Sequence, residues 1–241
     1  METDQIYDPL YLTENKKNNP KEYFKFIKAH IDGFLQQFNI PRLLDVGCAT
    51  GEFLYYLNSV YPKAKLAGVD IVPILLKKAQ ENVPSAKFWY ADIHEGTNLL
   101  TEKKQYDAVF MSGVHSIFDD YKHSLNHLLN LVDFDNKGRA FIFGIFNPED
   151  VDVLVKVKKI NKKENDQWES GWNCFSKKGI TNYLRSKGYS SNFNDFHITI
   201  DVDKRADNPL RSWTIKLDNG ARMIVHGSQI IHHFSLLTIQ L

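Results

Sequence analysis

The chain has 241 residues, of which 43% are hydrophobic, enough to bury the core of one α/β domain. Its 30 basic and 29 acidic residues give a formal net charge of +1, without the basic surplus typical of proteins that bind nucleic acids. Its two cysteines form no CxxC pair, so we expect neither a disulfide framework nor a zinc site. No signal peptide and no membrane-spanning apolar run is visible, so we expect a cytoplasmic protein without membrane or nucleic acid partners.

Short apolar runs alternate with amphipathic stretches through the first two thirds of the chain. The sequence Asn18-Asn19-Pro20 predicts the start of a helix, and apolar residues follow it at helical spacing. Five apolar runs have the length and composition of buried strands: 42–46, 65–69, 87–91, 106–111 and 139–145. Three helical patterns lie between them, at 52–61, 73–82 and 121–131. This alternation predicts a doubly wound parallel sheet with helices on both faces.

The last third of the chain has a different character, beginning with a polar, lysine-rich stretch at 147–172. One helix and four extended runs are predicted after it: a helix capped by Ser176 that runs to 187, and strands at 194–202, 213–217, 222–225 and 229–239. The sequence Asp218-Asn219-Gly220 predicts a hairpin between two of these runs.

The most informative segment is Leu43-Leu44-Asp45-Val46-Gly47-Cys48-Ala49-Thr50-Gly51, in which a buried strand leads into a glycine-rich turn and then a helix. Gly47 and Gly51 allow the backbone and a ligand to approach closely, because neither has a side chain that would clash. The free N–H groups at the start of the helix favour an anionic group such as a carboxylate. Asp45 is placed to support the turn or to meet an ammonium group.

Two further strands end in acidic residues. The second strand leads to Asp70, in the position where Rossmann-type sites have an acidic side chain that accepts hydrogen bonds from ribose hydroxyls. The third leads to Ala91-Asp92-Ile93, where Asp92 is placed to bond an adenine amino group and Ile93 to flank the ring. Since the glycine turn and these two ends follow three successive strands in order, together they indicate a nucleoside cofactor.

These residues resemble the signature of the class I S-adenosylmethionine methyltransferases, in which an acidic residue precedes glycine, cysteine or serine, glycine, any residue, and glycine. Ala49 stands here for the middle glycine, which tightens the turn near the methionine part of the cofactor. Nicotinamide-binding Rossmann proteins share the layout, but their glycine spacing differs from that of Gly47 and Gly51, so we favour the methyltransferase interpretation. The resemblance covers about 42–145.

The resemblance implies a Rossmann-like sheet of seven strands with the last one antiparallel, S-adenosyl-L-methionine as cofactor, and a methyltransferase of the EC 2.1.1 type. We expect a single domain over 1–241, with an N-terminal lid and helix at 1–40, a cofactor-binding core at 41–146, and a substrate-side insertion with C-terminal strands at 147–241. The lid segment at 6–11 includes Tyr7 and Tyr11. The expected cofactor contacts are Asp45, Gly47, Cys48, Ala49, Gly51, Asp70, Ile71, Ala91, Asp92, Ile93, Ser112 and Tyr11.

Histidines are the expected acceptor-side catalysts. Methyl transfer from a sulfonium removes the positive charge of the donor sulfur, so alignment and a deprotonated acceptor provide most of the acceleration. His115 follows the fourth strand, where family members commonly have substrate-facing residues, and it is the expected general base or substrate orienter. His232, beside His233 on the final run, is the second candidate.

The other expected substrate contacts lie in the last third. Trp168 and Trp172 concentrate aromatic surface in a polar stretch and are placed to wall an acceptor pocket. Arg211 is placed to hold an anionic group, with pairing to a surface aspartate as the alternative. The sequence Ser112-Gly113-Val114-His115 lacks the pattern of enzymes that methylate amino groups of nucleic acid bases, so we expect a small-molecule acceptor.

We predict methyl transfer to a small polar acceptor, and His115 favours a hydroxyl of a sugar, polysaccharide precursor or related metabolite. The alternative from another class is a noncatalytic S-adenosylmethionine-binding scaffold or partner subunit; an RNA methyltransferase that borrows its basic surface from a partner is a third interpretation. No metal is expected, because His123 and His127 share a helical face without a third ligand. Monomer and homodimer both stay open.

Overall fold

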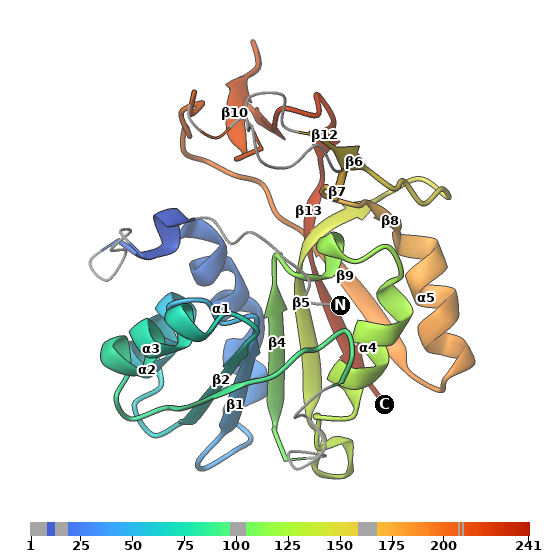
Figure 1. Ribbon diagram of the computed structural model, residues 1–241. Coiled ribbons are helices and arrows are strands. Elements are labelled where there is room, and N and C mark those ends of the chain that lie inside the picture. Colours follow the sequence, from blue (N-terminus) through green and yellow to red (C-terminus); the bar gives the residue numbers. More distant parts are fainter. Residues whose placement is uncertain (1–8, 13–18, 97–104, 159–167, 207, 209) are drawn as a thin grey trace. The chain divides into compact units, whose positions relative to one another are not determined.

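The computed structural model describes residues 9–12, 19–96, 105–158, 168–206, 208 and 210–241 (Figure 1). The chain divides into two compact units, the first built from 1–112 and 122–141 with Gln240, the second from 113–121 and 142–239 with Leu241. The boundaries that we expect at 40 and 146 for the parts of a single domain stay a prediction.

Four parallel strands lie side by side in the first unit (Figure 1). They are β1 (Arg42–Val46), β2 (Lys65–Asp70), β3 (Lys87–Tyr90) and β4 (Ala108–Ser112), each close to the predicted run. Strand β1 lies between β2 and β4, with Asp45 opposite Gly68 on one side and Phe110 on the other. Most residues of β1, β2 and β4 are buried, so their sequences are continuous apolar runs instead of alternating ones.

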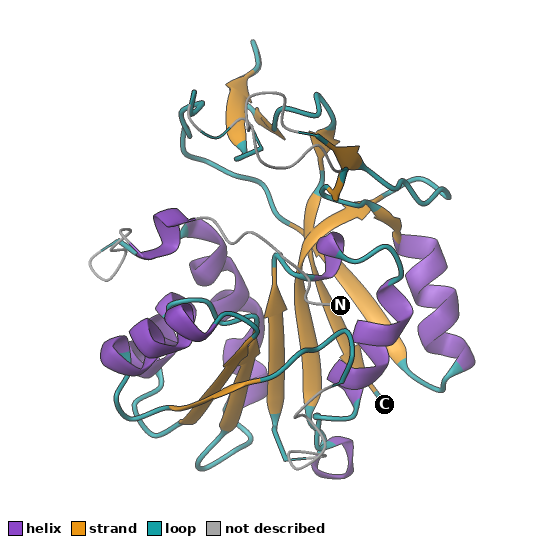
Figure 2. Cartoon of the chain, viewed as in Figure 1, coloured by secondary structure: helices purple, strands orange, loops and turns teal. Residues whose placement is uncertain are grey.

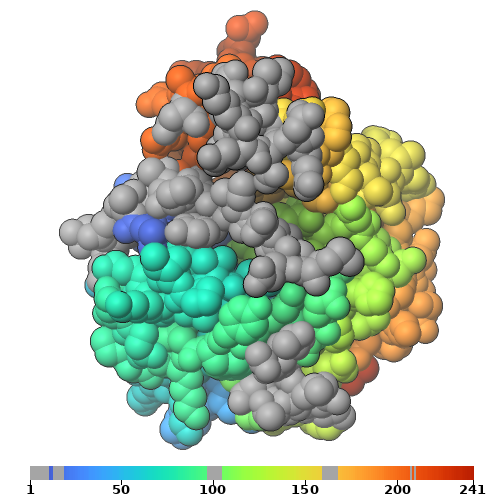
Figure 3. Space-filling view, in the orientation of Figure 1, coloured from blue at the N-terminus to red at the C-terminus, as the bar shows by residue number. Residues whose placement is uncertain are grey.

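The helices of this unit are η1 (Pro9–Leu12), α1 (Glu22–Leu35), α2 (Glu52–Val60), α3 (Pro73–Asn82), α4 (Tyr121–Leu129, whose first residue belongs to the second unit) and η4 (Phe134–Asn136). Side chains of the region from α3 to β3, coloured cyan to green in Figure 3, form a continuous surface. The apolar stripe of α1 is buried as predicted, and its Phe34 ring lies 5.5 Å from that of Phe141. The helix begins two residues after Pro20, because Lys21 keeps an extended backbone and serves as its N-cap.

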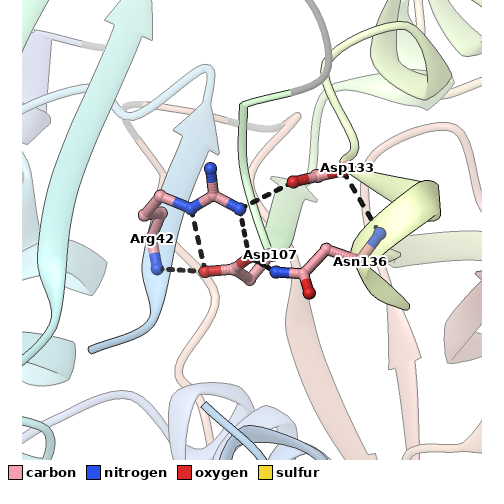
Figure 4. A network of polar contacts seen from close by, with 4 residues as sticks. All are labelled: Arg42, Asp107, Asp133 and Asn136. Atoms are coloured by element: carbon pink, nitrogen blue, oxygen red, sulfur yellow. Dashed lines mark hydrogen bonds and ion pairs between the residues drawn. The ribbon is translucent and has the colours of Figure 1, made fainter. Parts of the chain in front are cut away.

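A network of charged side chains lies where β1 begins and just before β4 (Figure 4). The carboxylate of Asp107, only 3% exposed, accepts hydrogen bonds from the backbone N–H and the guanidinium of Arg42, at 2.5 to 3.1 Å. Arg42 also pairs with Asp133 at 2.8 Å, and Asn136 donates to Asp107 at 3.4 Å. Because the network joins the chain before β4 to the start of β1, it fixes the register of the two strands at the edge opposite their carboxyl ends.

The second unit continues β5 (Arg139–Asn147), which begins in the first. Its other elements are η3 (His115–Ile117), β6 (Lys156–Val157), β7 (Glu169–Ser170), β8 (Phe175–Ser176), α5 (Lys177–Ser186), β9 (Ser190–Asp195), β10 (Trp213–Lys216), β11 (Arg222–Val225), β12 (Ile231–His232) and β13 (Phe234–Gln240). Figure 2 shows the short strands β10 to β12 joined by loops. The predicted cap is confirmed, because Ser176 Oγ accepts from the Gly179 N–H at 3.2 Å. The predicted hairpin is confirmed as the antiparallel pair of β10 and β11.

The strand order of the main sheet is β3-β2-β1-β4-β5-β13-β9, with β8 pairing with β5 off this path. The expected mixed, doubly wound sheet with one antiparallel strand is confirmed. The order reverses between β1 and β4, and sheets of this kind bind ligands outside the carboxyl ends of the strands at such a reversal. None of the helices in the described part of the chain is long and apolar enough to cross a bilayer.

Two predicted strands differ from the structure. The strand predicted at 194–202 is wrong in position: the strand is β9, which ends at Asp195, and Ile200 and Val202 beyond it are exposed. Among the described residues the backbone beyond Asp195 makes separate hydrogen bonds, from the Phe196 N–H to the Phe234 carbonyl and from the Thr214 N–H to the Val202 carbonyl, instead of a continuous ladder. The single run predicted at 229–239 is divided at His233, so that β12 pairs with β11 and β13 joins the main sheet.

Candidate functional site

The glycine-rich turn after β1 has three residues in the left-handed region, Gly47 (φ 74°), Ala49 (φ 46°) and Gly51 (φ 74°). The N–H groups of Gly47 and Cys48 both donate to the carbonyl of Val69, at 2.8 and 3.0 Å, which holds the turn against the end of β2. Gly51 is the N-cap of α2 and supplies no side-chain cap, so the first N–H groups of the helix are open to an anionic ligand.

Asp70 lies at the end of β2 with its carboxylate turned to the glycine turn. Its Oδ2 accepts from the Ala49 N–H at 2.8 Å and its Oδ1 from the Val72 N–H at 2.9 Å. Burial raises the pKa of Asp70, although these backbone hydrogen bonds oppose the shift. An ionised carboxylate offers about four lone-pair directions, so both oxygens can still accept from a ligand such as a ribose diol.

Asp45 is buried beneath the turn and is only 3% exposed. Burial raises its pKa well above the ordinary value, and the nearby carboxylate of Asp70 adds to the shift. Cys48 is also buried, and the pKa of its thiol is raised for the same reason, so it packs as a small apolar residue. A cationic ligand group would relieve the repulsion between the two carboxylates, and the ammonium of a methionine part has that charge.

The remaining expected cofactor contacts lie at the ends of β3 and β4. Oδ1 of Asp92 accepts from the N–H groups of His94 and Glu95, at 2.8 and 3.2 Å, which fixes the carboxylate while Oδ2 takes no part in either bond. Ile93 and Ala91 are buried beside it, and Ile71 is half-buried after β2. At the end of β4, Ser112 Oγ is buried without a hydrogen-bond partner in the described part of the chain.

Tyr11 lies on η1, which contacts α3. Lys21 Nζ lies 5.6 Å from the centre of the Tyr11 ring and 2.9 Å from Glu52 Oε2. Since Glu52 is the first residue of α2, Lys21 connects Tyr11 to the helix that follows the glycine turn. Tyr7, the other tyrosine of the expected lid, lies outside the described residues.

In the second unit, the structure places His115 in a tight, buried position on η3, 3% exposed. Its Nε2 lies 2.9 Å from the carbonyl of Ile145, and its ring stacks on Phe146 at 4.5 Å. A Cβ on Gly144 would lie 2.1 Å from Cε1 of this ring and 2.5 Å from Nδ1, so this side of the ring lies directly against β5. Burial lowers the pKa of His115 to about 4, so the imidazole is neutral at pH 7.

The other predicted acceptor residues have different environments. Trp172 and His232 come together around His226: the ring centres are 6.3 Å apart for Trp172 and His226, and 4.0 Å for His226 and His232. Trp168 is 67% exposed, and Arg211 is half-buried just before β10. Of the predicted acceptor residues, the structure therefore brings Trp172 and His232 into one cluster, which does not include Trp168.

Three residues of the second unit escaped the sequence analysis. Asn173 is fully buried; its Oδ1 accepts from the Val155 N–H at 2.8 Å and its Nδ2 donates to the Phe118 carbonyl at 2.7 Å. Gly144 is needed for the close approach of His115, and His226 is the centre of the histidine cluster. No local pattern marks them, because each depends on partners distant in the sequence.

Several proteins similar to this chain are methyltransferases by name. Residues 41–188, more than half of the chain, match the family described as "Methyltransferase domain". The malonyl-[acyl-carrier protein] O-methyltransferase 1 of Ilyobacter polytropus is 31% identical over 152 residues, which cover 58% of this chain and 54% of the relative. A trans-aconitate 2-methyltransferase of Enterobacter is 25% identical over 114 residues, covering 47% and 42%. The chain thus spans about half the length of the curated relatives it matches.

Solved structures share the fold. The CurJ carbon methyltransferase superimposes with a TM-score of 0.57 at 14% identity, covering 90% of this chain and 53% of that one. The YcgJ protein of Bacillus subtilis superimposes with a TM-score of 0.56 at 11% identity, covering 88% and 98%. The family match supports S-adenosylmethionine as the cofactor. The chain belongs to the methyltransferase-domain family and resembles its class I S-adenosylmethionine-dependent members.

Proposed function

We propose that this protein transfers a methyl group from S-adenosylmethionine to a hydroxyl oxygen of a small polar acceptor, such as a sugar, a polysaccharide precursor or a related metabolite. One observation carries the choice of acceptor. The first unit buries three aspartates, whereas the buried polar side chains among the described residues of the second unit are all uncharged at pH 7: His115, Ser116, Asn173, Ser176, His226, His232 and Ser235.

A neutral acceptor fits such an environment. A buried carboxylate or ammonium group needs an opposite charge or several hydrogen bonds to offset the loss of its hydration, whereas a hydroxyl needs one or two hydrogen bonds. Charged side chains of the second unit form exposed ion pairs, of which that of Arg222 with Asp201 at 2.7 Å is one. The cofactor would supply the methyl group from its sulfonium and leave as S-adenosylhomocysteine, while the hydroxyl proton would pass to solvent water. Because the positive charge of the sulfur would be lost, the acceptor side needs alignment more than charge stabilisation.

His115 is proposed as a positioning residue. A histidine with a pKa near 4 is a weak base at pH 7, and its ring is packed between Gly144 and Phe146. Its Nε2–H donates to the Ile145 carbonyl and so holds the segment after β4 against β5. We expect His115→Asn to raise the acceptor KM with a smaller change in kcat, and to leave the Kd of S-adenosylmethionine unchanged.

The test is an acceptor panel that contains glycosides, carboxylates and amines, followed by the formation of S-adenosylhomocysteine. A product methylated on a hydroxyl is an ether and survives mild alkali, whereas a methyl ester is hydrolysed. Alkali-stable product from the glycosides supports the proposal. Alkali-labile product from malonate or trans-aconitate contradicts it, and cofactor binding without turnover on any acceptor favours a noncatalytic scaffold. We place the reaction in the cytoplasm, with the protein as a monomer or homodimer.

A further inference from the structure

Two histidines of the short sheet in the second unit are buried against each other. His226 follows β11 and His232 ends β12, and these two strands pair antiparallel. The rings meet edge to face, 4.0 Å apart at an angle of 69°. His226 is 0% exposed and His232 is 4% exposed.

Hydrogen bonding in this cluster is incomplete. Nδ1 of His226 accepts from the Ser228 N–H at 3.0 Å, so in the neutral ring Nε2 has the proton. That Nε2, both ring nitrogens of His232 and Oγ of Ser228 are buried without a hydrogen-bond partner in the part of the chain described. Each unpaired buried group costs about 1–3 kcal/mol, so four of them in one cluster are unusual for a purely structural feature.

The cluster is also uncharged. Burial is the largest cause that lowers the pKa of His226 to about 4 and of His232 to about 3, and the neighbouring His226 and His233 add to the shift at His232. At pH 7 the unpaired atoms therefore include the N–H of His226, one N–H and one lone pair of His232, and the hydroxyl of Ser228. A group that both donates and accepts hydrogen bonds satisfies this set; a carboxylate, which only accepts, does not.

A metal ion is the other common ligand of paired histidines, and it does not fit here. Because Nδ1 of His226 accepts from a backbone N–H, its Nε2 has a proton and no lone pair for a metal. Among the described residues, no group of three or more histidine, cysteine or carboxylate side chains is placed to hold an ion.

We propose that His226, Ser228 and His232 form a subsite for the hydroxyl groups of the acceptor, with the ring of Trp172 as its wall. This inference rests on the proposed function, since it names the surface that selects a hydroxyl-bearing acceptor. Trp172 is half-buried with its ring 6.3 Å from that of His226, which leaves an aromatic face beside the polar atoms. Aromatic rings beside polar groups are suited to the apolar faces and hydroxyls of a sugar.

The test measures binding without turnover. Protein with nitrogen-15-labelled histidine, saturated with S-adenosylhomocysteine, is titrated with methyl glucoside or myo-inositol, and in parallel with malonate. We expect the ring nitrogens of His226 and His232 to shift with a hydroxyl-rich probe while both rings stay neutral, and the exposed His233 to serve as the unshifted control. Silence with both hydroxyl probes, or a malonate-induced shift towards the imidazolium position, overturns the proposal.

Variants separate binding from folding. His232→Phe removes two unpaired nitrogens, so its thermal midpoint should stay level or rise, while its affinity for the hydroxyl probe falls by about tenfold, the equivalent of one hydrogen bond. His226→Asn keeps an acceptor for the Ser228 N–H and should weaken binding similarly, and His233→Phe should change neither quantity. A lower midpoint with unchanged probe affinity in His232→Phe means that the cluster serves only the fold. Failure of hydroxyl methylation with these shifts present contradicts the proposed function alone.

Discussion

Adding one methyl group to β5 should disturb His115. In Gly144→Ala the new Cβ would lie 2.1 Å from Cε1 and 2.5 Å from Nδ1 of the ring, far inside van der Waals contact. The ring cannot turn away without leaving the Ile145 carbonyl and the face of Phe146. Overpacking costs about 1–3 kcal/mol and the lost hydrogen bond about 1 kcal/mol, so we expect a loss of about 2–4 kcal/mol in the free energy of unfolding.

A double-mutant cycle isolates this contact. In a His115→Ala background there is no ring for the new methyl group to meet, so Gly144→Ala should cost less than about 1 kcal/mol and the coupling energy should be about 2 kcal/mol. Urea unfolding followed by far-ultraviolet circular dichroism measures all four proteins, with the Kd of S-adenosylmethionine as a check on the first unit. An equal cost of Gly144→Ala in both backgrounds would refute the packing described for His115.

Three further predictions concern stability. Ala49→Gly removes a non-glycine residue from the left-handed region, where an L-residue costs about 1–2 kcal/mol. After allowance for the chain entropy of glycine, we expect urea unfolding to show a free energy of unfolding higher by about 0.5–1 kcal/mol, and a lower value contradicts this. Asp107→Asn leaves Arg42 with the carboxylate of Asp133 in place of two carboxylates, and differential scanning calorimetry should show a loss of about 2 kcal/mol, with no change in midpoint as the contrary result. The pKa of His115 is near 4 in the folded chain against about 6.5 in the unfolded chain. The contribution of the neutral ring to the free energy of unfolding, about 3 kcal/mol, is therefore present above pH 6.5 and is lost as the pH falls to 4. If the free energy of unfolding falls with decreasing pH no more steeply than in His115→Phe, this prediction is wrong.

The parts of the fold that the sequence predicts well are those with local causes. Buried parallel strands need continuous apolar runs, so β1 to β5 could be placed to within a residue or two. The glycine turn combines a strand, three left-handed positions and a helix start within nine residues, so the turn itself could be predicted, while its role in cofactor binding stays a prediction.

The parts that the sequence did not predict depend on distant partners. The alternation after Asp195 looked like a strand, but the backbone there makes separate hydrogen bonds, such as that from the Thr214 N–H to the Val202 carbonyl, instead of a continuous ladder, and Ile200 and Val202 are exposed. His226 gives no signal in the sequence, because its importance arises only when β12 brings His232 against it. His115 was found by its position after β4, but its burial against Gly144 depends on packing that no local pattern reveals.

The central claim is that the carboxyl ends of β1 to β4 bind S-adenosylmethionine through Asp70. The most direct test is calorimetric titration of the wild-type protein and Asp70→Ala with S-adenosylmethionine and S-adenosylhomocysteine. We predict micromolar binding of both ligands to the wild type and a loss of at least about tenfold in the variant, since two hydrogen bonds to the ribose disappear. Absence of heat and of any thermal shift with folded wild-type protein, or equal affinity in Asp70→Ala, would contradict the assignment.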